Sequence, residues 1–148
     1  MKVKFKYSNQ IIEGTLVYRK SENSFDFLSN KTGDISMLIK YLQITINASN
    51  NRMISVWGLH PYHLWEESDL IIPIFKNGII ECLGNYESGI SYRAEEYEDW
   101  KTYFNKNSGW ICIGNKNIFE EAVMFADNLG VVIVKDMMVA LWLKPQII

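Results

Sequence analysis

The two histidines of the chain are the first candidates for chemistry. His60 and His63 are three residues apart, and Glu66 and Glu67 follow closely. Imidazole and carboxylate groups that lie together can bind a metal ion or exchange protons. A shared metal site would need both imidazoles on one face of a helix, but Pro61 between them favours a turn. We therefore expect ordinary surface or turn histidines, and we predict neither a metal nor a cofactor.

The common catalytic motifs do not occur in this sequence. It contains no G-x-S-x-G elbow, no Walker loop and no H-E-x-x-H, and its glycines are scattered at expected turns. We therefore predict no catalytic residue and no enzymatic activity. One alternative stays open, a small ligand-binding domain or enzyme with an aromatic-lined pocket near His60 or His63. A concave pocket that holds either histidine beside a carboxylate would favour this alternative.

Two segments, residues 62–69 and 92–100, combine acidic and aromatic side chains at high density. Exposed carboxylates raise the rate of association with a basic partner, and aromatic rings supply buried contact area. The sequence therefore predicts a protein-binding surface. Its expected contact residues are Tyr62, Trp65, Glu66, Glu67, Asp69, Glu95, Glu96, Glu98 and Asp99. In the alternative reading, the charges only solvate an exposed face while Trp65 and Trp100 anchor the core.

Charge and composition exclude several classes of partner. The formal net charge is −2, so no overall positive field draws the chain to a nucleic-acid backbone. Cys82 and Cys112 lie in apolar runs rather than in a C-x-x-C pair, and we expect buried free thiols. The N-terminal residues lack the apolar core of a signal peptide, and no apolar stretch approaches the roughly 20 residues of a membrane span. The expected location is cytoplasmic, with no nucleic-acid or membrane partner.

Alternating or continuous apolar patterns predict strands along most of the chain. The clearest are residues 2–7, 11–20, 24–29, 41–47, 53–57, 109–114, 131–134 and 138–143. Residues 2–7 and 11–20 are expected to form a hairpin, and Asn77-Gly78 predicts a tight turn between residues 70–75 and 79–83. Residues 35–42 fit either a helix face or a strand. Residues 58–70 have the character of a loop, and Pro145 is expected to end the ordered chain.

Two segments carry helical patterns. Tyr97, Trp100 and Phe104 follow helical spacing within residues 95–104. Asn117 and Glu120 resemble a capping box before an apolar stripe that runs to Leu129, and Gly130 is expected to stop this helix. At 148 residues the chain suits a single globular domain over 1–148. The predicted fold class is α+β, mainly antiparallel sheet with one or two short helices.

The closing part of the chain carries a family resemblance. The run Gly109-Trp-Ile-Cys-Ile-Gly114 and the later run Ala140-Leu-Trp-Leu-Lys-Pro145 resemble immunity proteins of bacterial contact-dependent growth inhibition and related polymorphic toxin systems. The resemblance covers the last forty or so residues. It implies a cytosolic protein that binds the toxic C-terminal domain of a delivered effector, often a nuclease, and blocks its active site. The modest net charge departs from the strongly acidic inhibitors expected for very basic nucleases.

A third class of function is a structural protein that forms homo-oligomers. Such a protein would pair a long apolar edge strand with its own copy, and residues 131–143 are the best candidate for a homodimer contact.

Overall fold

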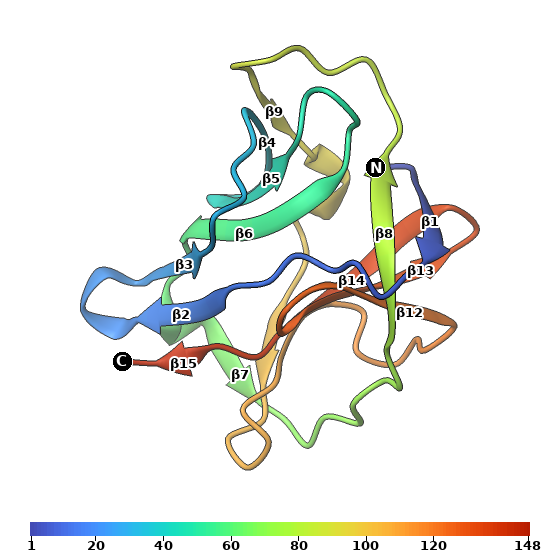
Figure 1. Ribbon diagram of the computed structural model, residues 1–148. Helices are drawn as coiled ribbons and strands as arrows, with labels where there is room; N and C mark the ends of the chain where they lie inside the picture. The colour runs from blue at the N-terminus through green and yellow to red at the C-terminus, as the bar shows by residue number, and fades with distance from the viewer.

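The computed structural model describes residues 1–148, which form strands and three short 3₁₀ segments but no α-helix. Figure 1 shows these strands in two layers, with the C-terminus beside β2 and β15. The strands are β1 (Val3–Tyr7), β2 (Thr15–Arg19), β3 (Ser24–Leu28), β4 (Ile35–Ile39), β5 (Leu42–Ile46), β6 (Met53–Leu59), β7 (Trp65–Glu67), β8 (Lys76–Cys82), β9 (Ser91–Arg93), β10 (Thr102–Phe104), β11 (Ile111–Gly114), β12 (Glu121–Ala126), β13 (Leu129–Val134), β14 (Met137–Leu143) and β15 (Gln146–Ile147). The 3₁₀ segments are η1 (Lys20–Glu22), η2 (Tyr62–Leu64) and η3 (Glu95–Tyr97).

The strands form two mixed sheets. One sheet has the order β1-β8-β12-β13-β14-β11-β10-β7 and the other has the order β15-β2-β3-β6-β5-β4-β9. Most neighbours are antiparallel, but the pairs β7–β10, β8–β12, β2–β15 and β4–β9 are parallel. The largest group of buried side chains takes members from both sheets, so the core lies between the two layers.

The predicted α+β class is therefore wrong, and the fold is essentially all-β. The expected helix over residues 117–129 is instead a loop followed by β12 and a turn into β13. In β12, Val123 and Phe125 face the core between the sheets while Ala122 lies in a second apolar cluster on the other side. Because both faces of β12 are covered, its apolar residues do not alternate with polar ones, and the pattern imitates a helical stripe. Asn128 turns the chain with a positive φ of 60°.

The expected helix over residues 95–104 is also wrong. Only Glu95–Tyr97 forms a single 3₁₀ turn, and residues 102–104 form β10. This strand pairs antiparallel with β11 and parallel with β7. Pairing with two neighbouring strands stabilises β10 more than the helical spacing of its aromatic residues would stabilise a helix. The sequence alone does not show this pairing.

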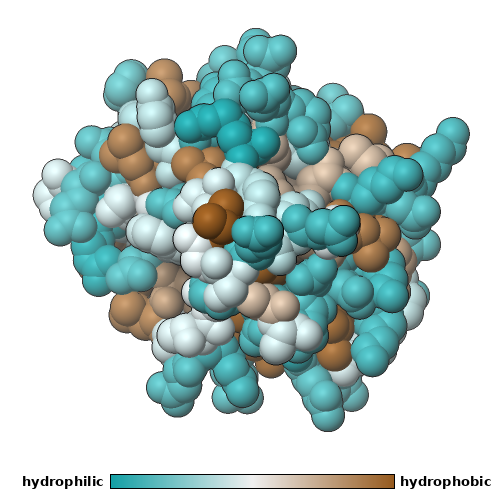
Figure 2. Space-filling model, turned by 90° about the horizontal axis from the view of Figure 1, so that it is seen from above, coloured by the Kyte–Doolittle hydropathy of each residue, from teal (hydrophilic) through white to brown (hydrophobic).

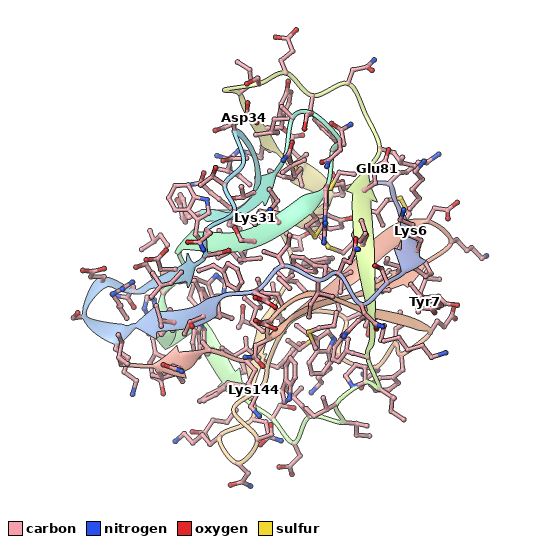
Figure 3. All side chains as sticks on the ribbon, in the orientation of Figure 1. Lys6, Tyr7, Lys31, Asp34, Glu81 and Lys144 are labelled. Atoms are coloured by element: carbon pink, nitrogen blue, oxygen red, sulfur yellow. The ribbon has the colours of Figure 1, made fainter.

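Two predicted hairpins do not form. β1 pairs with β8 rather than with β2, and β2 pairs with β3. Asn77-Gly78 lies inside β8 instead of forming a turn, and residues 70–75 are not a strand. A Cβ atom on Gly78 would lie 2.7 Å from Val123 Cγ1 and 2.8 Å from the Lys6 carbonyl oxygen. This glycine therefore serves close packing between strands, and Figure 3 shows Lys6 and Tyr7 on the neighbouring strand β1.

Other strand predictions are confirmed. β3, β6, β11, β13 and β14 match the predicted segments closely. The ambiguous residues 35–42 belong to the hairpin of β4 and β5, with Lys40 at a positive φ of 57°.

β13 and β14 lie in the interior of their sheet, so the proposed homodimer edge over residues 131–143 is wrong. The expected loop over residues 58–70 contains the end of β6 and all of β7, and β15 continues beyond Pro145.

A second, smaller apolar layer covers the outer face of the larger sheet. Cys112 and Trp142 are paired across β11 and β14 there, and the extended segment 68–75 lies over them with Leu70 and Phe75. Cys112, like Cys82 in the main core, is a buried free thiol as predicted. Burial raises the pKa of both thiols to about 12.

The surface offers no single large apolar patch on the face shown in Figure 2, where apolar side chains lie singly among polar ones. No helical segment combines the length and the hydropathy that crossing a membrane requires.

Candidate functional site

A cleft of about 380 Å³ opens where the two sheets meet beyond the end of β6. One wall comes from the β4–β5 turn and from β6, and the other comes from η2, β7, β10 and the segment that precedes β10. The lining residues are Lys40, Tyr41, Leu59, His60, Pro61, Leu64, Glu66, Glu98, Asp99, Trp100, Lys101 and Thr102. Both sheets therefore build this cleft.

His60 is the most buried titratable group of the cleft, with 8% of its surface exposed. Its backbone is held on both sides, since the Tyr18 hydroxyl donates to the His60 carbonyl oxygen at 2.6 Å and the His60 N–H donates to the Asn23 carbonyl oxygen at 2.7 Å. On the ring, Nε2 lies 2.7 Å from the Thr102 hydroxyl oxygen. These contacts fix the imidazole between β6 and β10.

Burial, with a smaller contribution from the positive charge of Lys40, lowers the pKa of His60 to about 4. The imidazole is therefore uncharged at neutral pH. An uncharged imidazole carries one donor and one acceptor nitrogen. The cleft accordingly presents a polar but neutral group at its inner end.

An aromatic cluster lies directly behind His60. Trp65 is its centre, with ring centroids 4.5 Å from Tyr18, 4.8 Å from Tyr62 and 5.4 Å from Phe104. Phe25 stacks on Trp65 at 5.9 Å. Trp65 and Tyr62 are half-buried and pack against the main core. The alternative in which Trp65 anchors the core describes its position better than a partner contact, and Tyr62 packs in the same way.

The predicted carboxylates separate into distinct groups. Glu66, Glu98 and Asp99 line the cleft. Glu67 forms an ion pair with Lys106 at 2.6 Å and lies with Asp69 in a separate, shallow depression.

The other two carboxylates lie outside the cleft. Glu95 is exposed, and Glu96 binds the amino group of Met1, which lowers the pKa of the Glu96 carboxyl. The structure thus brings three of the nine predicted residues together at one site.

The charges around the cleft nearly balance. Glu98 lies 3.8 Å from Arg93, which also donates to the Lys40 carbonyl oxygen. Among the lining residues this leaves Glu66 and Asp99 against Lys40 and Lys101. The cleft therefore does not select strongly for either sign of charge.

The cleft has little of what metal or proton-transfer chemistry requires. No three side chains of His, Cys, Asp or Glu lie close enough together to hold a metal ion. His63 is exposed on η2 and does not line the cleft with His60. His60 makes its side-chain hydrogen bond to Thr102, not to a carboxylate, so no acid orients it as in a catalytic pair. Its lowered pKa also makes it a weak base.

Reading the sequence missed most of the cleft. Lys40 and Tyr41 belong to a turn that was ambiguous, and Thr102 lay within the expected helix over residues 95–104. Leu59 and Leu64 are exposed apolar residues without a motif. The turn at Lys40 is marked only by the positive φ of that residue in the structure. Nothing in the order of residues links Lys40 to Thr102.

No protein-family model matches the chain, and no curated protein is significantly similar to it. The resemblance to immunity proteins therefore stays a prediction, and we infer function from the geometry of the cleft.

Proposed function

We propose that this protein binds another protein through the surface around the cleft and that it acts without covalent chemistry. The observation that carries this proposal is the gathering of exposed apolar side chains at a charged rim. Tyr41, Leu59 and Leu64 are 62%, 44% and 52% exposed, and they line the same cleft as Glu66 and Asp99. Apolar centres with polar rims are typical of protein interfaces.

The size of a stable interface defines how far this surface extends. A standard interface buries about 800 Å² on each partner, roughly a tenth of the 7829 Å² surface of this chain. The cleft alone is too small for that area. Trp57, which is 42% exposed and two residues before Leu59 on β6, extends the apolar surface beyond the cleft.

The biological role that we propose is that of a cytoplasmic immunity protein. In this role the partner is the toxic domain of a cognate effector, and binding blocks its active site. The rigid two-sheet scaffold supports this role because a preorganised surface loses little conformational entropy on binding. The near balance of charges at the rim favours a partner surface of mixed charge over a strongly basic one.

The test is co-expression with a candidate toxin domain taken from a neighbouring gene, scored by cell survival and by the dissociation constant of the purified complex. The double variant Glu66→Lys plus Asp99→Lys should weaken binding by about tenfold or more, because it reverses two rim charges. The matched control is Glu13→Lys plus Glu120→Lys, which reverses two exposed carboxylates away from the cleft. Equal affinity of the two double variants would reject this surface, and the absence of any protection would reject the immunity role.

A second candidate, a binder of a small molecule, is favoured by one specific observation. The cleft holds His60 together with carboxylates, and its volume falls at the lower end of the range of ligand pockets. A small-molecule binder should show a saturable rise in melting temperature with one compound of a metabolite library. A partner-binding protein should be stabilised most by the partner, and a library compound should give at most the small rise expected of a weak side-chain mimic.

A further inference from the structure

The ring of His60 has one nitrogen that is not used inside the protein. Nε2 is engaged with Thr102, and no protein group forms a hydrogen bond with Nδ1. The fully enclosed polar side-chain atoms without a partner are Arg52 Nε, Trp65 Nε1 and Trp142 Nε1, so Nδ1 is not sealed in the core. His60 lines the cleft with the 8% of its surface that remains exposed, and we take the accessible edge of its ring, which includes Nδ1, to meet the cleft.

The walls of the cleft are suited to an uncharged group with apolar surface. Tyr41, Leu59, Pro61, Leu64 and Trp100 supply apolar and aromatic surface. The rim carries both signs of charge in near balance, so neither a carboxylate nor an ammonium group gains a clear electrostatic advantage there. An aromatic ring would bury its faces against these walls and contribute the area that interface anchors usually supply.

The group that meets Nδ1 must complement the tautomer that the imidazole adopts beside Thr102. Depending on the tautomer, Nδ1 of a neutral histidine is a donor or an acceptor. A hydroxyl group both donates and accepts, so it complements either tautomer, whereas an indole N–H only donates. A ring that carries a hydroxyl group therefore satisfies the walls and the inner end of the cleft together.

We propose that the cleft holds a phenol ring, supplied by a tyrosine side chain of the partner protein, with its hydroxyl group hydrogen-bonded to Nδ1 of His60. This assignment rests on the proposed function, since it names the anchor by which the partner is held. Tyrosine combines a large buried area with few rotatable bonds, and it is enriched among interface anchors.

The test uses the full chain and p-cresol, which is the side chain of tyrosine as a free molecule. Titration by NMR should give saturable shifts of the Trp100 indole and the His60 ring signals. Toluene, which lacks only the hydroxyl group, should bind about fivefold more weakly, the effect of one net hydrogen bond. N-acetyl-tyrosinamide should shift the same signals, because a tyrosine on a peptide must also fit.

Two variants make the result specific. His60→Phe should abolish the preference for p-cresol over toluene, and the control His63→Phe should retain it. If His60→Phe does not fold, Leu64→Arg serves instead, because Leu64 is half exposed at the cleft and its replacement should block p-cresol binding without disturbing the core.

Several outcomes would overturn the assignment. Equal affinity for toluene and p-cresol would remove the role of Nδ1, and tighter binding of n-butylammonium or acetate would show that charge governs the cleft. Binding of p-cresol but not of N-acetyl-tyrosinamide would indicate a site for a free phenol. If p-cresol fails while Glu66→Lys plus Asp99→Lys weakens the partner complex, only the anchor is wrong. If p-cresol binds while that variant has no effect on the complex, the proposed function of this surface is wrong.

Discussion

At the scale of single residues, His60 affects both the stability of the fold and the proposed binding role. Its imidazole is hydrogen-bonded to Thr102, its backbone is hydrogen-bonded to Tyr18 and Asn23, and burial keeps the ring uncharged at neutral pH. The same burial that makes it a neutral group for a ligand also makes its protonation costly to the fold. Stability at low pH is therefore sensitive to this one side chain.

We predict that His60 destabilises the fold as the pH falls. Its pKa is about 4 in the folded chain and 6.5 without the protein environment. Between these values the unfolded chain binds more protons at this residue, so the contribution of His60 to the free energy of unfolding rises with pH from 4 to 6.5 and is constant outside this window. The gap corresponds to about 3 kcal/mol. Urea unfolding of the wild type and of His60→Gln at pH 7 and pH 4 measures it.

The control for this prediction is His63→Gln, because His63 is exposed on η2. It should keep the pH dependence of the wild type, whereas His60→Gln should lose about 3 kcal/mol of it. Identical pH dependence in His60→Gln and the wild type would contradict the burial of an uncharged imidazole.

At the scale of elements, the segment 68–75 explains why the larger sheet is apolar on both faces. Phe75 stacks on Trp110 with centroids 5.5 Å apart and meets Trp142 edge-on at 6.4 Å. It also lies over Gly130 of β13, where an added Cβ atom would be 2.5 Å from Phe75 Cε1. Gly130 is thus a packing position in a strand and not the end of a helix.

We predict that Gly130→Ala destabilises the protein by about 1–3 kcal/mol, because the new methyl group would displace a packed aromatic ring. The change is measured as the free energy of unfolding in urea. In a Phe75→Leu background, the same substitution should cost clearly less, since the smaller side chain leaves room. An equal cost in both backgrounds would place the strain in the backbone and contradict the packing explanation.

At the scale of the whole molecule, strands that are far apart in sequence close both sheets. Val3 of β1 pairs with Cys82 of β8, and Gln146 of β15 pairs with Val17 of β2. The pairs lie at the edges of their sheets, so the start of the chain completes one layer and its end completes the other. Such pairings close long loops of the chain, which costs conformational entropy.

This topology predicts slow folding. Proteins dominated by long-range strand pairing fold in milliseconds to seconds, because loop closure must precede the contacts that reward it. Stopped-flow dilution from urea, followed by tryptophan fluorescence, should show the main phase in this range. Folding that is complete within microseconds would be inconsistent with the observed strand order.

The candidate site was predicted in part. Glu66, Glu98 and Asp99 were expected at a binding surface, and they do line the cleft. Local composition could identify them because exposed acidic residues near aromatic rings are visible in any short window. Tyr62 and Trp65 were assigned to the same surface, but they pack toward the core. A short window of sequence does not distinguish an aromatic residue that packs into the core from one that contacts a partner.

The sequence by itself determined where most strands lie, because alternation and apolar runs act within a few residues of each other. It also indicated two buried free thiols. Only the tertiary structure decided which strands pair, that β12 is a strand covered on both faces, and that Lys40, His60 and Thr102 share one cleft. These features depend on contacts between distant segments, whose energies a local pattern does not contain.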